Sequence, residues 1–137
     1  MTDKELETYK LHRKFDRMGR LVGDNKMKIL MRSHVMVIGL GGVGSWAAEA
    51  LIRSGVGKIT LVDFDEICVT NFNRQLHAVT GMIGTQKAIA MAERLKLINP
   101  KAMIIPIAKF YNPEHQAEIF TEKPDYVIDA IDNVTAK

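Results

Sequence analysis

The 137-residue chain contains one cysteine, Cys68, and it has no long uncharged apolar run. A single cysteine excludes an internal disulfide and favours a cytoplasmic protein. No segment approaches the ~18 apolar residues that a membrane-spanning helix needs, so no membrane span is expected. The N-terminal residues Met-Thr-Asp-Lys-Glu lack the basic and apolar pattern of a secretory signal, and none is expected.

The composition is that of an ordinary globular domain. The chain is 47% hydrophobic and 26% charged, and its net charge is +3. Its length suits one domain. The small basic excess is compatible with a nucleotide or an RNA partner, but it is more typical of an ordinary solvated surface.

A glycine motif is the most informative stretch of the chain. Four apolar residues, 35–38, predict a buried strand, and Gly39, Gly41 and Gly44 then form G-x-G-x-x-G before an apolar-periodic helix over 43–51. This order of strand, tight turn and helix is the context in which the motif binds phosphate, because the glycines allow close backbone approach and the helix N-terminus offers free N–H groups. The ligand is predicted to be a nucleotide. The motif alone leaves NAD as the default.

Strands and helices alternate through the rest of the chain. Further strands are expected over 59–62, 103–107 and 126–128, and helices over 85–98 and 114–120. Thr85 is expected to cap the first of these helices and Asn99-Pro100 to end it, while Pro106 indicates an edge or an end of its strand. The pattern predicts an α/β fold: a Rossmann-like, doubly wound parallel sheet with right-handed crossovers.

The N-terminal third has a different pattern. Residues 1–33 are expected to form a charged helical arm, and residues 34–137 to form the nucleotide-binding unit. Thr2 or Asp3 could cap a first helix, Gly19 and Gly23 interrupt the pattern, and Asp24 is expected to cap a second helix over 25–32.

Acidic residues follow two of the expected strands. Asp63 and Asp65 follow the second strand, and Asp129 and Asp132 follow the fourth. Because ligands of open parallel sheets bind beyond the carboxyl ends of the strands, these side chains are expected beside the glycine loop. Asp63 comes 19 residues after Gly44, where a ribose-binding acid is expected, and another carboxylate could hold a divalent metal. The alternative for Asp63 is a residue that simply ends a strand.

A donor-rich segment favours a triphosphate over NAD. Asn71, Asn73, Arg74 and Gln75 lie in one loop, and Lys87 opens the following helix. Fixed cations and donors stabilise the charge that develops when the α-phosphorus of a triphosphate is attacked. A lysine at this position is unfavourable for the helix dipole, which suggests a role toward a ligand. A solvated lysine without such a role remains an equal alternative.

The remaining cysteine and histidines carry weaker signals. Cys68 lies between Ile67 and Val69, which predicts a packed small residue rather than a nucleophile. His77 could contact a ligand, but its expected role is to cap its loop. The other three histidines have no metal-like spacing.

Taken together, these residues resemble the ubiquitin-activating-enzyme-like adenylating proteins. The matching positions are Gly39-x-Gly41-Gly42-x-Gly44, Asp63-x-Asp65, Asn71-x-Asn73-Arg74-Gln75, Lys87 and Asp132-Asn133. The group includes bacterial adenylyltransferases that activate sulfur-carrier proteins for thiamin and molybdopterin synthesis. The stretches 44–51 and 68–77 are most similar to the tRNA threonylcarbamoyladenosine dehydratases, which use ATP to activate a carboxylate on a modified tRNA adenosine and close it into a cyclic form.

The resemblance implies a role for each matching position. The glycine loop, with Gly39, Gly41, Gly42 and Gly44, would hold the phosphates of ATP, and Asp63 would bind its ribose. Asp65 and Gln75 also match the family's motifs and would belong to the same ATP site. Asn71, Arg74 and Lys87 would face the triphosphate, and Asp132 would hold Mg²⁺. In this family an N-terminal arginine reaches the ATP site of the partner subunit, which makes Arg17 and Arg20 candidates and implies a homodimer. Surface arginines on a helical arm are the alternative.

Members of this family are about twice as long, so the chain is expected to be the N-terminal, ATP-binding half of such an enzyme and to be inactive alone. Contacts with tRNA are expected mainly in the other half. Two further interpretations stay open. One is an adenylyltransferase that acts on the C-terminus of a sulfur-carrier protein, and the other is a nucleotide-binding fragment without turnover or an NAD-binding module.

Overall fold

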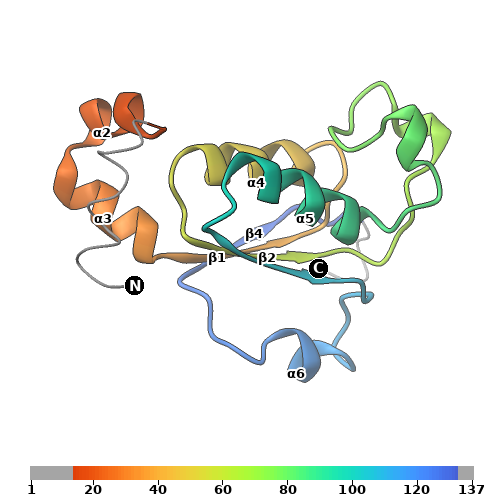
Figure 1. The fold of residues 1–137 in the computed structure, drawn as a ribbon. Coiled ribbons are helices and arrows are strands. Elements are labelled where there is room, and N and C mark those ends of the chain that lie inside the picture. Colours follow the sequence, from red (N-terminus) through yellow and green to blue (C-terminus); the bar gives the residue numbers. More distant parts are fainter. Residues whose placement is uncertain (1–13, 133–137) are drawn as a thin grey trace.

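Four parallel strands form the centre of the molecule. The structure is a computed structural model and describes residues 14–132. The strands are β1 (His34–Ile38), β2 (Lys58–Val62), β3 (Met103–Ile107) and β4 (Tyr126–Asp129), and they lie side by side in the order β3-β2-β1-β4 (Figure 1). This is the order of the first four strands of a Rossmann fold, in which the chain reverses direction beside the first strand. The predicted fold class is confirmed, and so is the placement of Pro106 on an edge strand.

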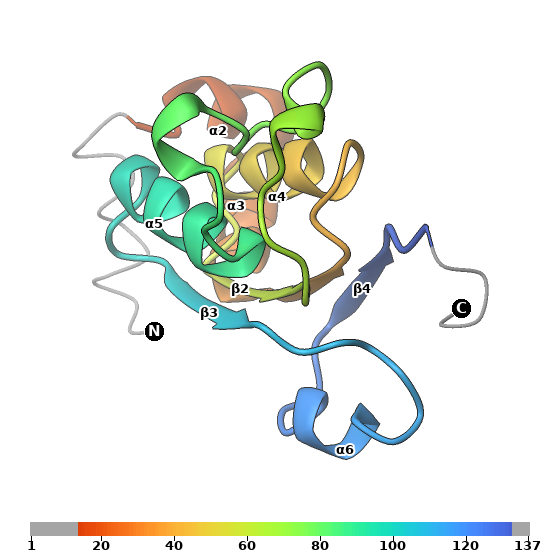
Figure 2. The same ribbon diagram turned by 90° about the vertical axis from the view of Figure 1, so that its right-hand side faces the viewer.

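Helices lie on both faces of the sheet. α4 (Gly44–Arg53) and α5 (Lys87–Ile98) cover one face, and the short α6 (Gln116–Ile119) lies on the other (Figures 1 and 2). Two short 3₁₀ helices, η1 (Val69–Asn71) and η2 (Thr80–Met82), form part of the long connection between β2 and α5. No helix among residues 14–132 is long and apolar enough to cross a membrane.

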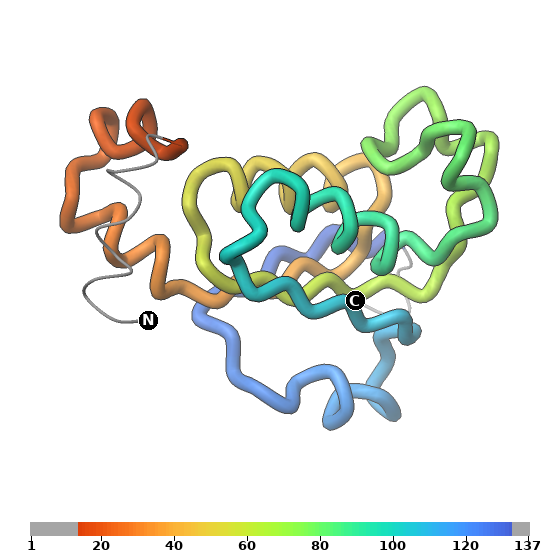
Figure 3. The backbone as a smooth tube through the Cα atoms, in the orientation of Figure 1, coloured from red at the N-terminus to blue at the C-terminus, as the bar shows by residue number. Residues whose placement is uncertain are grey.

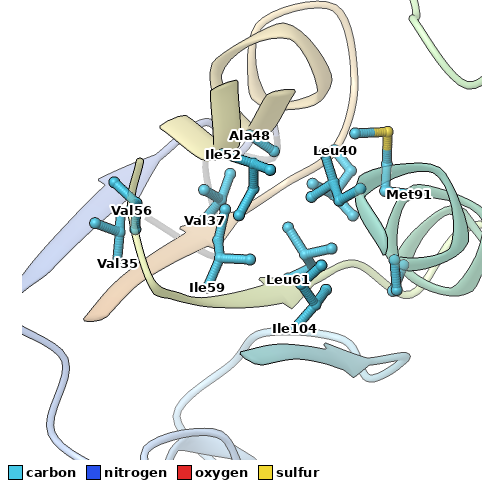
Figure 4. Packing of buried hydrophobic residues seen from close by; sticks show 13 residues of the cluster. Val35, Val37, Leu40, Ala48, Ile52, Val56, Ile59, Leu61, Met91 and Ile104 are labelled. Atoms are coloured by element: carbon cyan, nitrogen blue, oxygen red, sulfur yellow. The ribbon is translucent and has the colours of Figure 1, made fainter. Parts of the chain in front are cut away.

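The core explains why β1 is apolar without alternation. All five of its residues are buried, because helices cover both faces of a parallel sheet. Val37 packs with Ile59 and Leu61 of β2 under α4 and α5 (Figure 4), whereas Met36 and Ile38 face the opposite side. Successive side chains point to opposite faces, so one run of four apolar residues supplies both halves of the core.

The N-terminal helices precede the sheet, as predicted. α2 (Asp16–Val22) and α3 (Asp24–Arg32) lie at the end where the strands begin, away from the strand carboxyl ends (Figures 1 and 3). Phe15 and Met27 form a small buried cluster between them. This cluster packs on the turn at Gly55, where φ is +104° and a Cβ would lie 2.9 Å from Met27 Cε.

Several local expectations are wrong. Asp24 is the first residue of α3 rather than its cap, which is Gly23, and Gly19 lies inside α2. α5 begins at Lys87, so Gln86 occupies the N-cap position, and Thr85 lies one residue before it and makes no cap. The helix expected over 114–120 is shortened to four residues. The expected caps at positions 2 and 3 lie outside the described residues.

Two glycines fix the turn from β1 into α4. A Cβ on Gly44 would lie 1.6 Å from the carbonyl oxygen of Gly39. Gly39 itself has a φ of +95°, and a Cβ there would lie 2.5 Å from the carbonyl oxygen of Ala130. Both positions therefore exclude every other residue, since even a methyl group overlaps backbone that cannot move aside.

We expect Gly44→Ala to lower the free energy of unfolding by roughly 1–3 kcal/mol or more, because overpacking against backbone forces the turn open. Urea unfolding measures this change. Gly81→Ala is the matched control: no atom lies within 4 Å of a Cβ at that position. Its effect should stay within about 0.5 kcal/mol. Equal stability of the two variants would contradict the close contact.

Candidate functional site at the carboxyl ends of the strands

One cavity of about 270 Å³ lies where the four strands end. Its walls come from the segments that follow β1, β2, β3 and β4, together with the first residue of α5. The polar and glycine residues among them are Gly39, Gly41, Asp63, Asp65, Lys87, Lys109, Tyr111 and Asp132. The cavity thus lies at the point where the strand order reverses, which is the usual ligand site of this architecture.

The glycine loop presents backbone N–H groups at this cavity. Within residues 14–132, the N–H groups of Gly41 and Gly42 have no acceptor. The following α4 begins at Gly44, so its unpaired N-terminal amides and the positive end of its dipole lie in the same place. The loop therefore provides donors for an anion without any cationic side chain.

Asp63 supports this loop from the end of β2. Its Oδ2 accepts the N–H of Leu40 at 2.7 Å, and its Oδ1 accepts the N–H of Asp65 at 2.7 Å. Each carboxylate oxygen can accept a second hydrogen bond. Asp63 can therefore hold the loop and still accept from the hydroxyl groups of a ligand.

Lys87 reaches the cavity because the two ends of the segment 66–86 are hydrogen-bonded to each other beside the end of β2. The N–H of Lys87 donates to the carbonyl of Asp65 at 2.9 Å, and Ile67 exchanges backbone hydrogen bonds of 2.9 Å with Gly84 and Thr85. Lys87 is 7% exposed, and its ammonium group makes no hydrogen bond or ion pair with another described residue. Because charges interact more strongly where water is scarce, an ammonium group that lines the cavity without a carboxylate partner among the described residues is suited to an anionic ligand.

The loop residues 71–75 lie beside the glycine loop rather than in the cavity wall. Asn71 is buried, and its Oδ1 accepts the N–H of Cys68 at 2.8 Å. Arg74 packs over Gly42, 3.4 Å from the position of a Cβ there, and its Nη1 donates to Thr70 and Asn73. Gln75 Nε2 lies 3.5 Å from the Cβ position of Gly41. These three roles toward a triphosphate stay predictions.

Asp132 is the carboxylate placed over the glycine loop. Its Oδ2 lies 4.0 Å from the Cβ position of Gly41, and its side chain is exposed. The part of the chain that is described contains no cluster of three or more acidic, histidine or cysteine side chains suited to a metal. Mg²⁺ commonly binds through one or two carboxylates completed by substrate phosphates, and Asp132 fits that kind of site.

Arg17 and Arg20 are not part of this chain's own cavity. Both are exposed on α2, at the opposite end of the sheet from the strand carboxyl ends (Figure 1). Arg20 forms an ion pair with Asp16, at 3.2 Å between Nε and Oδ2. Any contact of either arginine with a nucleotide would therefore have to be made in another subunit.

Sequence reasoning missed one wall of the cavity. Lys109, Phe110 and Tyr111 follow β3, and Phe110 makes an edge-to-face contact with Phe64 at 6.3 Å between ring centroids. The strand over 103–107 was correctly expected, so the strand-end rule could have found these residues. They add an apolar surface and a second lysine, Lys109, which pairs with Glu118.

The expectation that Cys68 is a packed residue is wrong. Its side chain is exposed, and the hydroxyl of Thr70 donates to its sulfur at 3.3 Å. That hydrogen bond lowers the pKa of the thiol. His77, by contrast, is buried, and its Nε2 bonds the carbonyl of Leu40 at 2.7 Å.

Known proteins resemble this chain over most of its length. The family model of the ThiF family matches residues 15–137. The tRNA threonylcarbamoyladenosine dehydratase of Haemophilus influenzae is 52% identical over 124 residues, which are 90% of this chain and 48% of that protein. The molybdopterin-synthase adenylyltransferase of Escherichia coli is 34% identical over 108 residues, which are 79% of this chain and 43% of that protein.

A solved structure also matches the fold. The crystal structure of tRNA N6-threonylcarbamoyladenosine dehydratase from Escherichia coli in complex with ATP has a TM-score of 0.88 and 45% identity, over 90% of this chain and 51% of that one. The chain spans about half the length of the curated relatives it matches. The family model covers nearly all of the sequence, and the chain therefore belongs to the ThiF family.

Proposed function

We propose that this chain forms the ATP-binding half of an ATP-dependent tRNA threonylcarbamoyladenosine dehydratase. The observation that carries the proposal is the cavity in which the free amides of the glycine loop, Asp63, the unpaired Lys87 and Asp132 meet. The 52% identity to the enzyme of that name from Haemophilus influenzae, and the likeness to a relative crystallised with ATP, support the choice of nucleotide and reaction.

Different groups in and beside the cavity suit the ribose, the phosphates and the base of ATP. Asp63 keeps acceptor capacity for the ribose hydroxyls, and the free amides of Gly41 and Gly42 suit the phosphates. The rings of Phe64 and Phe110 offer an apolar wall for the base. The volume of about 270 Å³ is slightly below the ~300–1,000 Å³ of typical ligand pockets, so part of the nucleotide would lie in the open crevice.

The reaction would begin with attack of the substrate carboxylate on the α-phosphorus of ATP. The bond to pyrophosphate breaks as the new oxygen–phosphorus bond forms, and a nucleophile of the same modified adenosine then closes the ring and displaces AMP. Negative charge grows on the transferring and leaving groups, and the Lys87 ammonium is placed to stabilise it. Arg74, beside Gly42, would turn toward the same charge. Asp132 would hold Mg²⁺, which neutralises phosphate charge when bound.

The test is turnover by the whole protein with ATP and tRNA that carries threonylcarbamoyladenosine. We expect the nucleoside to lose one water, as measured by mass spectrometry. Lys87→Ala or Arg74→Ala should lower the rate on the order of 10²–10³-fold, because a donor to developing charge is lost. Lys101→Ala, an exposed lysine at the end of α5, should leave it unchanged.

The 34% identity to a molybdopterin-synthase adenylyltransferase supports a second candidate function. That function is adenylation of the C-terminal carboxylate of a small sulfur-carrier protein. Pyrophosphate exchange that depends on such a carrier, together with no dehydration of tRNA, would replace the dehydratase by the adenylyltransferase. If neither substrate reacts while ATP binds, the chain belongs to a nucleotide-binding protein without this turnover.

The ribose role of Asp63 has its own prediction. Asp63→Ala should weaken ATP binding to the whole protein by roughly 1–3 kcal/mol, because buried donors lose their acceptor. Isothermal titration calorimetry measures the change. Asp129→Ala is the control: Asp129 also ends a strand, but its carboxylate accepts the N–H of Ile131 and does not line the cavity. Unchanged ATP affinity in Asp63→Ala would remove the assignment.

The charge of the N-terminal helices supports an RNA partner. Residues 14–32 carry six cations and two carboxylates, a net charge of +4, whereas residues 33–132 carry a net charge of −2. All six cations are exposed, and the buried Phe15–Met27 cluster holds α2 and α3 in place beneath them. Clustered exposed cations on a fixed surface bind the phosphate backbone of nucleic acid. We therefore propose that α2 and α3 contribute to tRNA binding.

Replacing Lys26 and Lys28 together by Glu should weaken tRNA binding and flatten its dependence on salt by about 1–2 in the slope of log K against log salt, because phosphate contacts are lost. Fluorescence anisotropy with labelled tRNA at several salt concentrations measures both. Lys101 and Lys123 replaced by Glu make a charge-matched control on other exposed segments. Equal loss in both double variants would indicate net charge alone rather than this surface.

We further propose a homodimer in the cytoplasm. The position of Arg17 and Arg20 at the far end of their own sheet supports a role in a partner's ATP site, and the relatives named as tRNA-modifying enzymes support the location. Analytical ultracentrifugation of the whole protein tests the dimer, which a monomer at micromolar concentration would contradict.

A further inference from the structure

His77 lies behind the glycine loop and not in the cavity. It is 3% exposed, and its Nε2 lies 2.7 Å from the carbonyl oxygen of Leu40. Because a carbonyl can only accept, Nε2 carries the proton of this hydrogen bond. The other ring nitrogen, Nδ1, is buried and has no partner among the described residues.

The tautomer follows from that unpartnered nitrogen. If Nδ1 also carried a proton, the ring would bury a charge and an unpaired donor together, which is far more costly than one unpaired acceptor. The imidazole is therefore neutral, with its proton on Nε2. Burial, and the nearby charge of Lys87, lower the pKa of His77 in agreement with this.

The hydrogen bond decides which way a peptide of the loop faces. The peptide bonds of the described chain are trans, so the N–H of Gly41 points opposite to the carbonyl of Leu40. With that carbonyl held by His77 on the inner side, the N–H of Gly41 is turned away from His77. Gly41 lines the cavity, and its N–H has no acceptor within residues 14–132.

The neighbouring peptides are held in the same manner. Asp63 accepts the N–H of Leu40 at 2.7 Å, which fixes the preceding peptide. Ser45 Oγ donates to the carbonyl of Gly41 at 2.5 Å and accepts the N–H of Leu76 at 3.2 Å, which fixes the following one. Three consecutive peptides of the glycine loop are thus oriented by side chains from β2, from α4 and from the loop that contains His77.

We propose that His77 is a positioning residue for phosphate binding: by holding the carbonyl of Leu40 it keeps the N–H of Gly41 directed at the phosphates of the nucleotide. The inference rests on the proposed function, because it assumes that the glycine loop binds the phosphates of ATP. It adds a residue outside the cavity wall, acting through a peptide and not through contact with the ligand.

The test compares two substitutions of His77 in the whole protein. His77→Phe keeps the ring but has no donor, and we expect the dissociation constant of ATP to rise roughly tenfold or more, since a hydrogen bond to a charged phosphate is misdirected. KM for ATP should rise more than kcat falls. His77→Gln can place an N–H near the position of Nε2, and it should restore most of the affinity.

His34→Phe is the matched control. His34, the first residue of β1, is also buried and also bonds through Nε2, but to Thr60 Oγ1 of β2, and it does not line the cavity. It should cost stability without changing ATP affinity. If His34→Phe and His77→Phe weaken ATP binding equally, or if His77→Phe remains folded with unchanged affinity, the positioning role is wrong.

Hydrogen exchange separates this inference from the proposed function. In the protein without nucleotide, His77→Phe should accelerate amide exchange of the peptide covering residues 39–44, and His77→Gln should not. Exchange unchanged by His77→Phe overturns the positioning role whatever the protein binds. Accelerated exchange in a protein whose wild type binds inorganic pyrophosphate but not ATP would keep the role of His77 and reject ATP as the ligand.

Discussion

The contact between Gly39 and Gly44 is the constraint on which the site depends. The chain turns from β1 into α4 within five residues. The turn is so tight that a Cβ on Gly44 would lie 1.6 Å from the carbonyl oxygen of Gly39. That turn brings the N-terminus of α4 to the carboxyl end of the central strand. Side chains from other segments are fixed against this turn: Asp63 and His77 hold Leu40 inside it, and Arg74 packs on Gly42.

Periodicity predicted the sheet well because burial on both faces leaves a simple signal. Residues 35–38 form an apolar run with no alternation, and the structure places them in β1 with helices on both sides. β3 matched its expected bounds, 103–107. Helix starts were predicted less well. Thr85 and Asp24 are good capping residues, yet Gln86 and Gly23 precede α5 and α3, because backbone pairing of the 66–86 segment and the tight turn at Gly23 outweigh a single cap.

The sequence indicated which residue types form the site but not how they reach it. Lys87 follows Asp63 by 24 residues, and only the paired backbone of Asp65, Ile67, Gly84 and Thr85 closes the intervening segment and brings the two together. No periodic pattern encodes such a closure. Asn71 shows how a polar side chain can serve a loop: its Oδ1 holds the start of η1, while its role toward a phosphate stays a prediction. Side chains rich in hydrogen-bonding groups serve loops as readily as ligands, and composition does not distinguish the two uses.

Three carboxylates around a phosphate-binding loop would repel a bare anion. The hydrogen bonds and exposure of the three carboxylates explain how they can lie beside such a loop. Asp63 spends one lone pair of each oxygen on backbone amides, so part of its charge is balanced within the loop. Asp65 and Asp132 remain exposed and line the cavity together with Lys87. A ligand that combines phosphates, hydroxyl groups and a bound cation satisfies all three kinds of partner, whereas free phosphate satisfies only the amides and Lys87. The charge pattern therefore favours a metal-bound nucleotide over a simple anion. This argument does not depend on which acceptor substrate the protein uses.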